Sequence, residues 1–259
     1  MSNEYDNCLA ELRRRELLPE SRVAVFVSGS LVREWSNEKS DLDLFVICGE
    51  PWVSGSASAA HVALQPDVIL TELTYVGKRR WDVKYWLDAQ VDQLAHKVSW
   101  AQFDANPSAA ALVTWREMDF LERLDYGVAL DGSDWLERRR QELDESALRS
   151  IVVARHLKLV EVLLEDASGQ VAAGDVESAV LSARQAFGHA VDALLASHGQ
   201  LGQRDKWRAR RFRQCKQDTI SFDDYWAFET MRSLDPAAPA RWVERVVFVC
   251  RQLMLDIDL

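Results

Sequence analysis

The chain has 259 residues, of which 48% are hydrophobic and 28% are charged, enough for one large packed domain or two ordinary ones. Asp and Glu total 41 against 31 for Lys and Arg, so the formal net charge is −10 and nucleic acid is not an expected partner. Four scattered cysteines without a C-x-x-C pair exclude a disulfide scaffold. The sequence lacks both a signal-peptide pattern and an apolar run of about 20 residues, so we expect a cytoplasmic protein without a membrane partner.

The first hundred residues predict helices mixed with strands. Apolar runs and alternation of acidic with apolar residues indicate the strands, and Gly, Ser and Pro mark the turns between them. The predicted elements are a helix over 9–17, a strand over 23–27, the start of a helix over 31–35, a strand over 41–47, a loop over 51–60, and strands over 68–75 and 81–86 joined by a turn at 77–80.

From about residue 88 onward the apolar residues recur with a helical period. Gly127 and the pair Asp131-Gly132 interrupt this pattern, and we place a domain boundary there. The expected fold class is α+β, with a mixed-sheet domain over 1–132 and an all-α helical bundle over 133–259. The predicted helices cover 109–124, 135–164 as one long or two abutting helices, 176–197, 204–216, 222–233 and 240–255.

One segment combines a phosphate-binding turn with paired carboxylates. Gly29-Ser30 directly follows the first strand, where a glycine lets the backbone approach a ligand and a following helix would offer free N–H groups. Ten residues later, Asp41 and Asp43 lie two apart, so both carboxylates point to one face of a strand. Oxygen-only ligands of this kind favour Mg²⁺ held jointly with substrate phosphates, which predicts metal-assisted transfer from a nucleoside triphosphate.

These residues resemble the nucleotidyltransferase superfamily, the DNA polymerase beta-like enzymes, and the layout is similar to the kanamycin-nucleotidyltransferase and minimal-nucleotidyltransferase types. In that pattern a third carboxylate lies on a neighbouring strand, and Asp82 matches it best, with Glu72 as the second choice. The resemblance implies two Mg²⁺ ions bound by Asp41, Asp43 and Asp82, and Asp82 would also activate the attacking hydroxyl. Lys84 shares the face of Asp82 and could neutralise it instead of leaving it to a metal.

The resemblance also implies the substrates. A nucleoside monophosphate, AMP from ATP in the first instance, would move to a hydroxyl of a small acceptor such as an antibiotic or a natural-product intermediate, with release of pyrophosphate. The helical domain would bind that acceptor. Two alternatives stay open, namely AMP transfer to a protein, as in toxin–antitoxin relatives, and a catalytically inactive relative that binds a nucleotide or RNA. The sequence also leaves a homodimer open.

Several basic residues have both a functional and a structural interpretation. Arg33 and Lys39 are candidates for holding triphosphate oxygens, although charged residues in turns are commonly solvated. The basic segment 206–213 predicts either a solvated helix face or a phosphate-binding wall. Arg184 and His189 have the spacing of HEPN-type ribonucleases, but residues five apart do not share a helix face well, so we favour a substrate-binding role for this domain.

Overall fold

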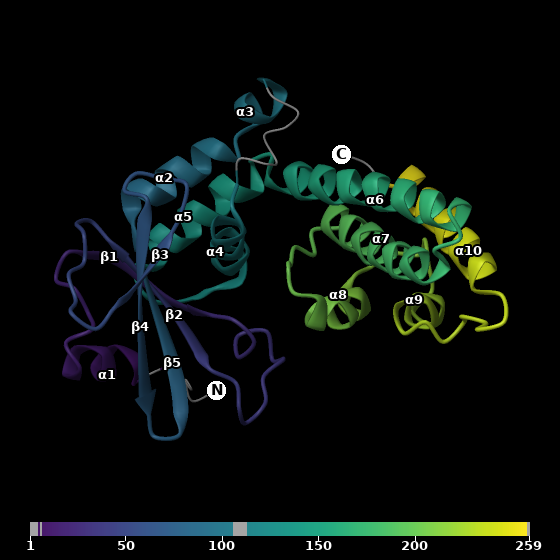
Figure 1. Cartoon of the computed structure of the whole chain (residues 1–259). Coiled ribbons are helices and arrows are strands. Elements are labelled where there is room, and N and C mark those ends of the chain that lie inside the picture. The colour runs from purple at the N-terminus through teal and green to yellow at the C-terminus, as the bar shows by residue number, and fades with distance from the viewer. Residues whose placement is uncertain (1–4, 6, 106–112, 258–259) are drawn as a thin grey trace. The chain divides into compact units, whose positions relative to one another are not determined.

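The computed structural model describes residues 5, 7–105 and 113–257, and the chain divides into two compact units, Met1–Ala147 and Leu148–Leu259 (Figure 1). All four cysteines lie in the described part, and each is a free thiol. Within the same described residues, every helix is too short or too polar to cross a bilayer.

The first unit is built on a six-stranded mixed sheet with the strand order β3-β4-β5-β2-β1-β6. The central strands β2 and β5 pair in parallel, and all other neighbours pair antiparallel. The predicted α+β class is therefore confirmed. The strands are β1 (Arg22–Ser28), β2 (Leu42–Cys48), β3 (Ser58–His61), β4 (Val68–Val76), β5 (Arg79–Leu87) and β6 (Val128–Asp131).

Helices pack on both faces of this sheet, because the central strands bury side chains on each side. On one face, Leu12 of α1 joins a core cluster with the strand residues Leu44 and Val83. On the other face, which we call the α4 face, Phe120 of α4 packs against Phe45 and Trp86. The helices of this unit are α1 (Cys8–Arg14), α2 (Asp88–Lys97), α3 (Trp100–Ala105), α4 (Trp115–Tyr126) and α5 (Ser133–Asp144).

The segment 31–35, expected to begin a helix, forms a turn instead, so this prediction was wrong. The turn is closed by bonds from the Arg33 N–H to the Gly29 carbonyl at 3.3 Å and from the Trp35 N–H to the Ser30 carbonyl at 2.8 Å. Glu34 has a φ of 56°, in the left-handed region, so the chain cannot continue from this turn as a right-handed helix. The anion-binding helix N-terminus expected after Ser30 is therefore absent from this described segment.

The end of the first unit also differs from the expectation. Gly127 and Gly132 flank β6, which the sequence did not predict and which adds to β1 at the sheet edge. α5 contacts β1 and lies in the first unit, whereas the sequence starts the helical domain at residue 133. Of the helix predicted over 109–124, residues 109–112 lie outside the described residues, and α4 begins after Thr114, whose side chain caps it.

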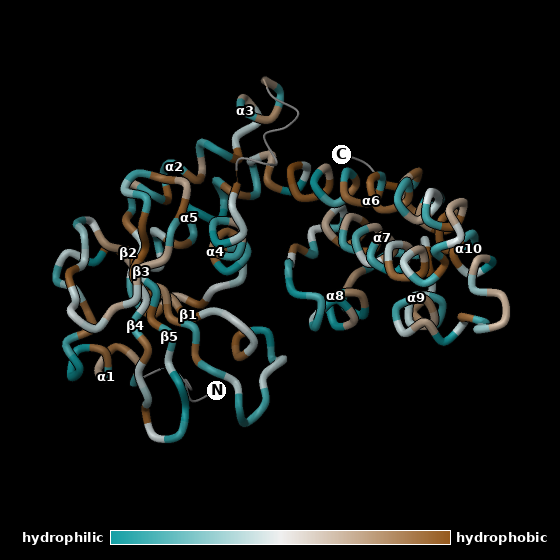
Figure 2. Tube along the Cα trace, viewed as in Figure 1, coloured by the Kyte–Doolittle hydropathy of each residue, from teal (hydrophilic) through white to brown (hydrophobic). Residues whose placement is uncertain are grey.

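The second unit consists of helices around α7. α7 contacts each of the four other α-helices of the unit, and small buried residues such as Ala183, Ala186 and Ala190 allow close approach. Hydrophobic and hydrophilic residues alternate along α6, as expected of a helix with one packed face (Figure 2). The elements are α6 (Leu148–Ala172), α7 (Val176–Ser197), the 3₁₀-helix η2 (Asp205–Trp207), α8 (Arg208–Gln214), α9 (Phe222–Glu229) and α10 (Pro239–Leu255).

Candidate active site

The three predicted aspartates meet on the α4 face of the sheet. In the parallel pairing of β2 with β5, Asp43 lies directly opposite Asp82, so both side chains point to the same side. Asp41 precedes β2 by one residue and lies two positions before Asp43. Arg80 bonds the carboxylates of both Asp41 and Asp82, which places these two carboxylates within reach of one guanidinium.

Glu72, the second choice for the third carboxylate, points to the opposite face of the sheet. Its partner in the antiparallel pairing of β4 with β5 is Val83, whereas Asp82 pairs with Leu73. The buried Glu72 carboxylate accepts hydrogen bonds from the hydroxyls of Ser54 and Ser56, the latter at 3.0 Å to both oxygens. Its position therefore separates it from Asp43 by the thickness of the sheet.

Each aspartate has a basic partner. Asp43 is buried and accepts bonds from Lys84 Nζ at 2.7 Å and from Arg123 Nη1 at 3.1 Å. Lys84 thus pairs with Asp43 and not with Asp82, the partner considered from the sequence. Arg123 extends from α4 one turn beyond Phe120, so the helix that covers the sheet also supplies a cation to the site.

Burial and the charges of the cluster together shift the pKa of Asp82. Burial raises the pKa of Asp82 above its usual value, and the neighbouring charges of Asp41 and Asp43 raise it further, while Arg80 opposes them. Arg80 in turn has a raised pKa because of Asp82. The repulsion among three carboxylates is therefore still felt at Asp82 although cations surround them.

Gly29 brings the turn after β1 against the second aspartate. Its φ is +91°, and a Cβ at this position would lie 2.4 Å from Asp43 Oδ2 and 2.8 Å from Arg123 Nη1. The preceding Ser28 is fully buried, and its hydroxyl donates to the Arg123 carbonyl at 2.9 Å. Only glycine combines this backbone conformation with such close approach. Ser30 follows at the same turn and is partly exposed.

The two predicted phosphate-binding cations lie in the segment that joins β1 to β2. The Arg33 guanidinium stacks over the Trp35 ring at 3.8 Å and over the Tyr126 ring at 4.7 Å. Lys39 is exposed, and its backbone N–H donates to the side chain of Asn37 at 2.9 Å. Arg33 is thus held against aromatic rings, whereas the Lys39 side chain extends from a surface turn.

The donors of this face suit a hard divalent cation. Asp41, Asp43 and Asp82 offer carboxylate oxygens only, which is the ligand type that Mg²⁺ prefers. Burial is the largest cause of the raised pKa of Asp82, and a cation would stabilise the charged form that burial disfavours. Metal entry between Asp41 and Asp82 requires that Arg80 leave, because its guanidinium bonds both carboxylates.

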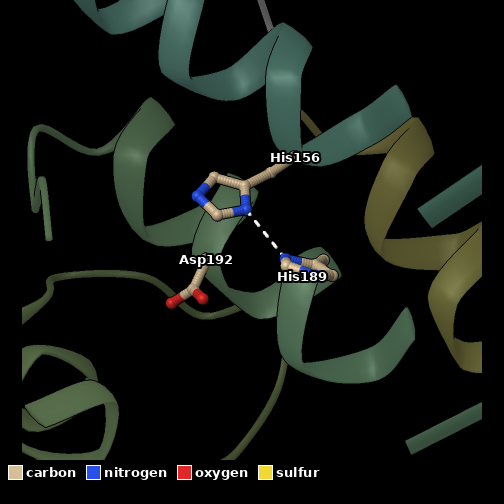
Figure 3. Close-up of side chains that lie close together, drawn as sticks. All are labelled: His156, His189 and Asp192. Atoms are coloured by element: carbon tan, nitrogen blue, oxygen red, sulfur yellow. Dashed lines mark hydrogen bonds between the residues drawn. The ribbon is translucent and has the colours of Figure 1, made fainter. Parts of the chain in front are cut away.

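A second cluster of titratable side chains lies in the helical unit, and the sequence pattern does not indicate that its members meet. His156 of α6 and His189 of α7 face each other with 3.0 Å between their Nδ1 atoms, and Asp192 lies next to them (Figure 3). These three form a group of potential metal ligands within 4.8 Å of one another in the described part of the chain. Burial lowers the pKa of His156 to about 4, so the ring is neutral at pH 7.

Asp192, however, is engaged by two buried arginines of the basic segment 206–213. Arg208 donates to both of its oxygens, at 3.0 and 2.8 Å, and Arg211 donates to Oδ1 at 2.7 Å. Two guanidinium groups beside this carboxylate disfavour a metal ion. The two arginines instead tie α8 to α7. They belong neither to a solvated helix face nor to a phosphate-binding wall.

The proposed ribonuclease pair is divided between different partners. Arg184 donates to the Glu229 backbone carbonyl at 3.1 Å and to its carboxylate at 3.3 Å, whereas His189 bonds His156. His189 has a lowered pKa because burial disfavours its charged form. Arg184 and His189 therefore make separate packing contacts within the helical unit, and their spacing is accounted for without a ribonuclease site.

Comparison with known proteins supports the fold. No family model and no curated protein sequence matches the chain. Among solved structures, the chain is similar to a nucleotidyltransferase-like protein from Exiguobacterium sibiricum, with a TM-score of 0.52 and 10% sequence identity over 97% of this chain and 74% of that protein. The chain therefore has a nucleotidyltransferase-like fold.

Proposed function

We propose that the protein is a Mg²⁺-dependent nucleotidyltransferase that moves AMP from ATP, or another nucleoside monophosphate from its triphosphate, to a hydroxyl of a small acceptor. The observation that carries this proposal is the pairing of Asp43 with Asp82 across β2 and β5, on the face to which Asp41 also contributes. The Gly29 turn lies against the same carboxylates. An antibiotic or a natural-product intermediate is the class of acceptor that we expect.

The three aspartates and the segment that follows β1 have different parts in the transfer. Asp41, Asp43 and Asp82 would hold two Mg²⁺ ions, which neutralise charge on the triphosphate and on the departing pyrophosphate. Asp82 accepts the proton of the acceptor hydroxyl, whose oxygen forms a bond to the α-phosphorus while the bond to the pyrophosphate oxygen breaks. The backbone at Gly29 and Ser30, together with Arg33 and Lys39, would contact the phosphate oxygens.

The observed ion pairs favour one alternative, a relative that binds nucleotides without turnover. Arg80, Lys84 and Arg123 together carry as much positive charge as the three aspartates carry negative charge. A face neutralised in this way is stable without a metal. An RNA-binding role has less support, because Arg208 and Arg211 of the basic segment are buried.

The proposal is tested by screening small hydroxyl compounds with each of the four nucleoside triphosphates and Mg²⁺ while pyrophosphate release is followed. We expect Asp82→Asn to lower turnover about 100-fold or more, the scale of losing a positioned base. Glu72→Gln is the control, since it neutralises a carboxylate on the neighbouring strand that is buried on the opposite face of the sheet, and it should leave turnover nearly unchanged.

The same assay distinguishes the alternatives. Label from α-labelled ATP that becomes attached to protein would indicate a protein AMP-transferase, and nucleotide binding without pyrophosphate release would indicate an inactive relative. An active Asp82→Asn variant beside an inactive Glu72→Gln variant would show that the third carboxylate is assigned to the wrong strand.

A further inference from the structure

Arg80 occupies the position between two of the proposed metal ligands. It lies on β5 two residues before Asp82 and therefore on the same face. Its Nε donates to Asp82 Oδ1 at 2.8 Å and its Nη2 to Asp82 Oδ2 at 3.2 Å, while Nη2 also bonds Asp41 Oδ2. One guanidinium thus bridges the two carboxylates that a divalent cation would bridge.

The three cations of the site differ in how easily they can leave. Lys84 and Arg123 are mostly buried, and both pair with the buried Asp43. Arg80 keeps 46% of its side chain exposed, against 15% for Asp82. Because solvent screens an exposed ion pair and a long side chain can move into water at little cost, Arg80 is the replaceable cation of the three.

We propose that Arg80 is an internal counter-cation that occupies the metal site in the nucleotide-free protein and is displaced when Mg²⁺ enters with the nucleotide. This inference rests on the proposed function. A metal ion alone must compete with a cation that is already covalently part of the chain. A metal ion that arrives with a triphosphate brings phosphate oxygens, which complete its ligand set and accept bonds from the displaced guanidinium.

The test measures Mn²⁺ binding by electron paramagnetic resonance, with Mn²⁺ replacing Mg²⁺ and without nucleotide. Arg80→Gln should tighten Mn²⁺ binding about tenfold relative to the unchanged protein, because the competing charge is gone. Lys78→Gln is the matched control: Lys78 is exposed in the turn between β4 and β5, and its loss removes the same charge two residues away. Its Mn²⁺ affinity should stay within about twofold of that of the unchanged protein.

A second variant locates the bound ion. Adding Asp82→Asn to Arg80→Gln should abolish the gain in affinity, since the gain arises from the pair of carboxylates that Arg80 leaves. Circular dichroism of each variant checks that the fold is retained. In the unchanged protein, a non-hydrolysable ATP analogue should tighten Mn²⁺ binding strongly, and in Arg80→Gln the analogue should add less.

The outcomes separate this inference from the proposed function. The unchanged protein could bind Mn²⁺ with the ATP analogue and yet have the same Mn²⁺ affinity as Arg80→Gln without nucleotide. That result would overturn the role of Arg80 and leave the metal site in place. Failure of every folded variant to bind Mn²⁺, with or without the analogue, would overturn both.

Discussion

The clearest energetic consequence of the structure concerns Asp192. This side chain is 4% exposed and is the shared partner of Arg208 and Arg211, whose side chains are also buried. Asp192→Asn keeps the shape but removes the negative charge, so the buried Arg211 loses its carboxylate partner, while Arg208 keeps Glu229 and Asp205. Removal of one partner of a buried ion pair costs about 3–5 kcal/mol, and we expect a loss of unfolding free energy in this range.

Asp205→Asn provides a control on the same arginine. Asp205 also bonds Arg208 Nη2 at 2.8 Å, but 82% of its side chain is exposed, so its loss should cost below about 1 kcal/mol. Hydrogen–deuterium exchange of peptides from α7 and α8 measures the local effect, and urea unfolding followed by circular dichroism measures the total. If Asp192→Asn were no more destabilising than Asp205→Asn, the arginines would not serve to hold α8 on α7.

Two further predictions follow from local geometry. Gly29→Ala should weaken binding of Mg²⁺ and ATP about tenfold or more in calorimetry, because its Cβ meets Asp43, whereas Gly77→Ala, with φ +60° and no atom within 4 Å, should bind normally. His156 has a pKa of about 4 when folded and about 6.5 when unfolded, so its contribution to stability is complete above pH 6.5 and is lost as the pH falls toward 4, by about 3 kcal/mol. In His156→Gln the unfolding free energy should depend less on pH over this range. An unchanged dependence on pH would contradict the lowered pKa of His156.

The sequence is sufficient for elements that local patterns determine. The bounds of α7 coincide with the prediction because an apolar helical period follows Asp175, whose side chain caps the helix by accepting from the Ser178 N–H at 3.2 Å. The apolar runs that become β1, β2 and β5 are equally clear. Local signals failed at β6, where four residues between two glycines form a strand only because the edge of β1 is available.

The candidate site required information that the sequence does not hold. Whether Asp82 or Glu72 joins Asp43 depends on strand pairing, and the observed register places Asp82 opposite Asp43 and Glu72 opposite Val83. The ion pairs of the site join residues far apart in the chain, such as Arg123 and Asp43. The sequence pattern predicts a turn at Arg80, whereas the structure places Arg80 in β5 on the same face as Asp82.

The structure also changes how the central aspartate must be tested. Asp43 is buried against Lys84 and Arg123, so Asp43→Asn should lose stability and turnover together, and lost turnover alone would not establish metal binding. The Asp41 side chain is 34% exposed, so Asp41→Asn should lower turnover with little change in the free energy of unfolding. Adding Lys84→Met to Asp43→Asn removes one charge of each sign, and Arg123 keeps Asp119 as a partner at 3.7 Å.

The double variant should therefore recover much of the thermal stability that Asp43→Asn loses, while its pyrophosphate release stays at background. Thermal unfolding and the turnover assay, performed on the same preparations, measure the two quantities separately. Recovery of turnover along with stability would mean that Asp43 acts only as the counter-charge of Lys84, and the metal-binding role would then rest on Asp41 and Asp82.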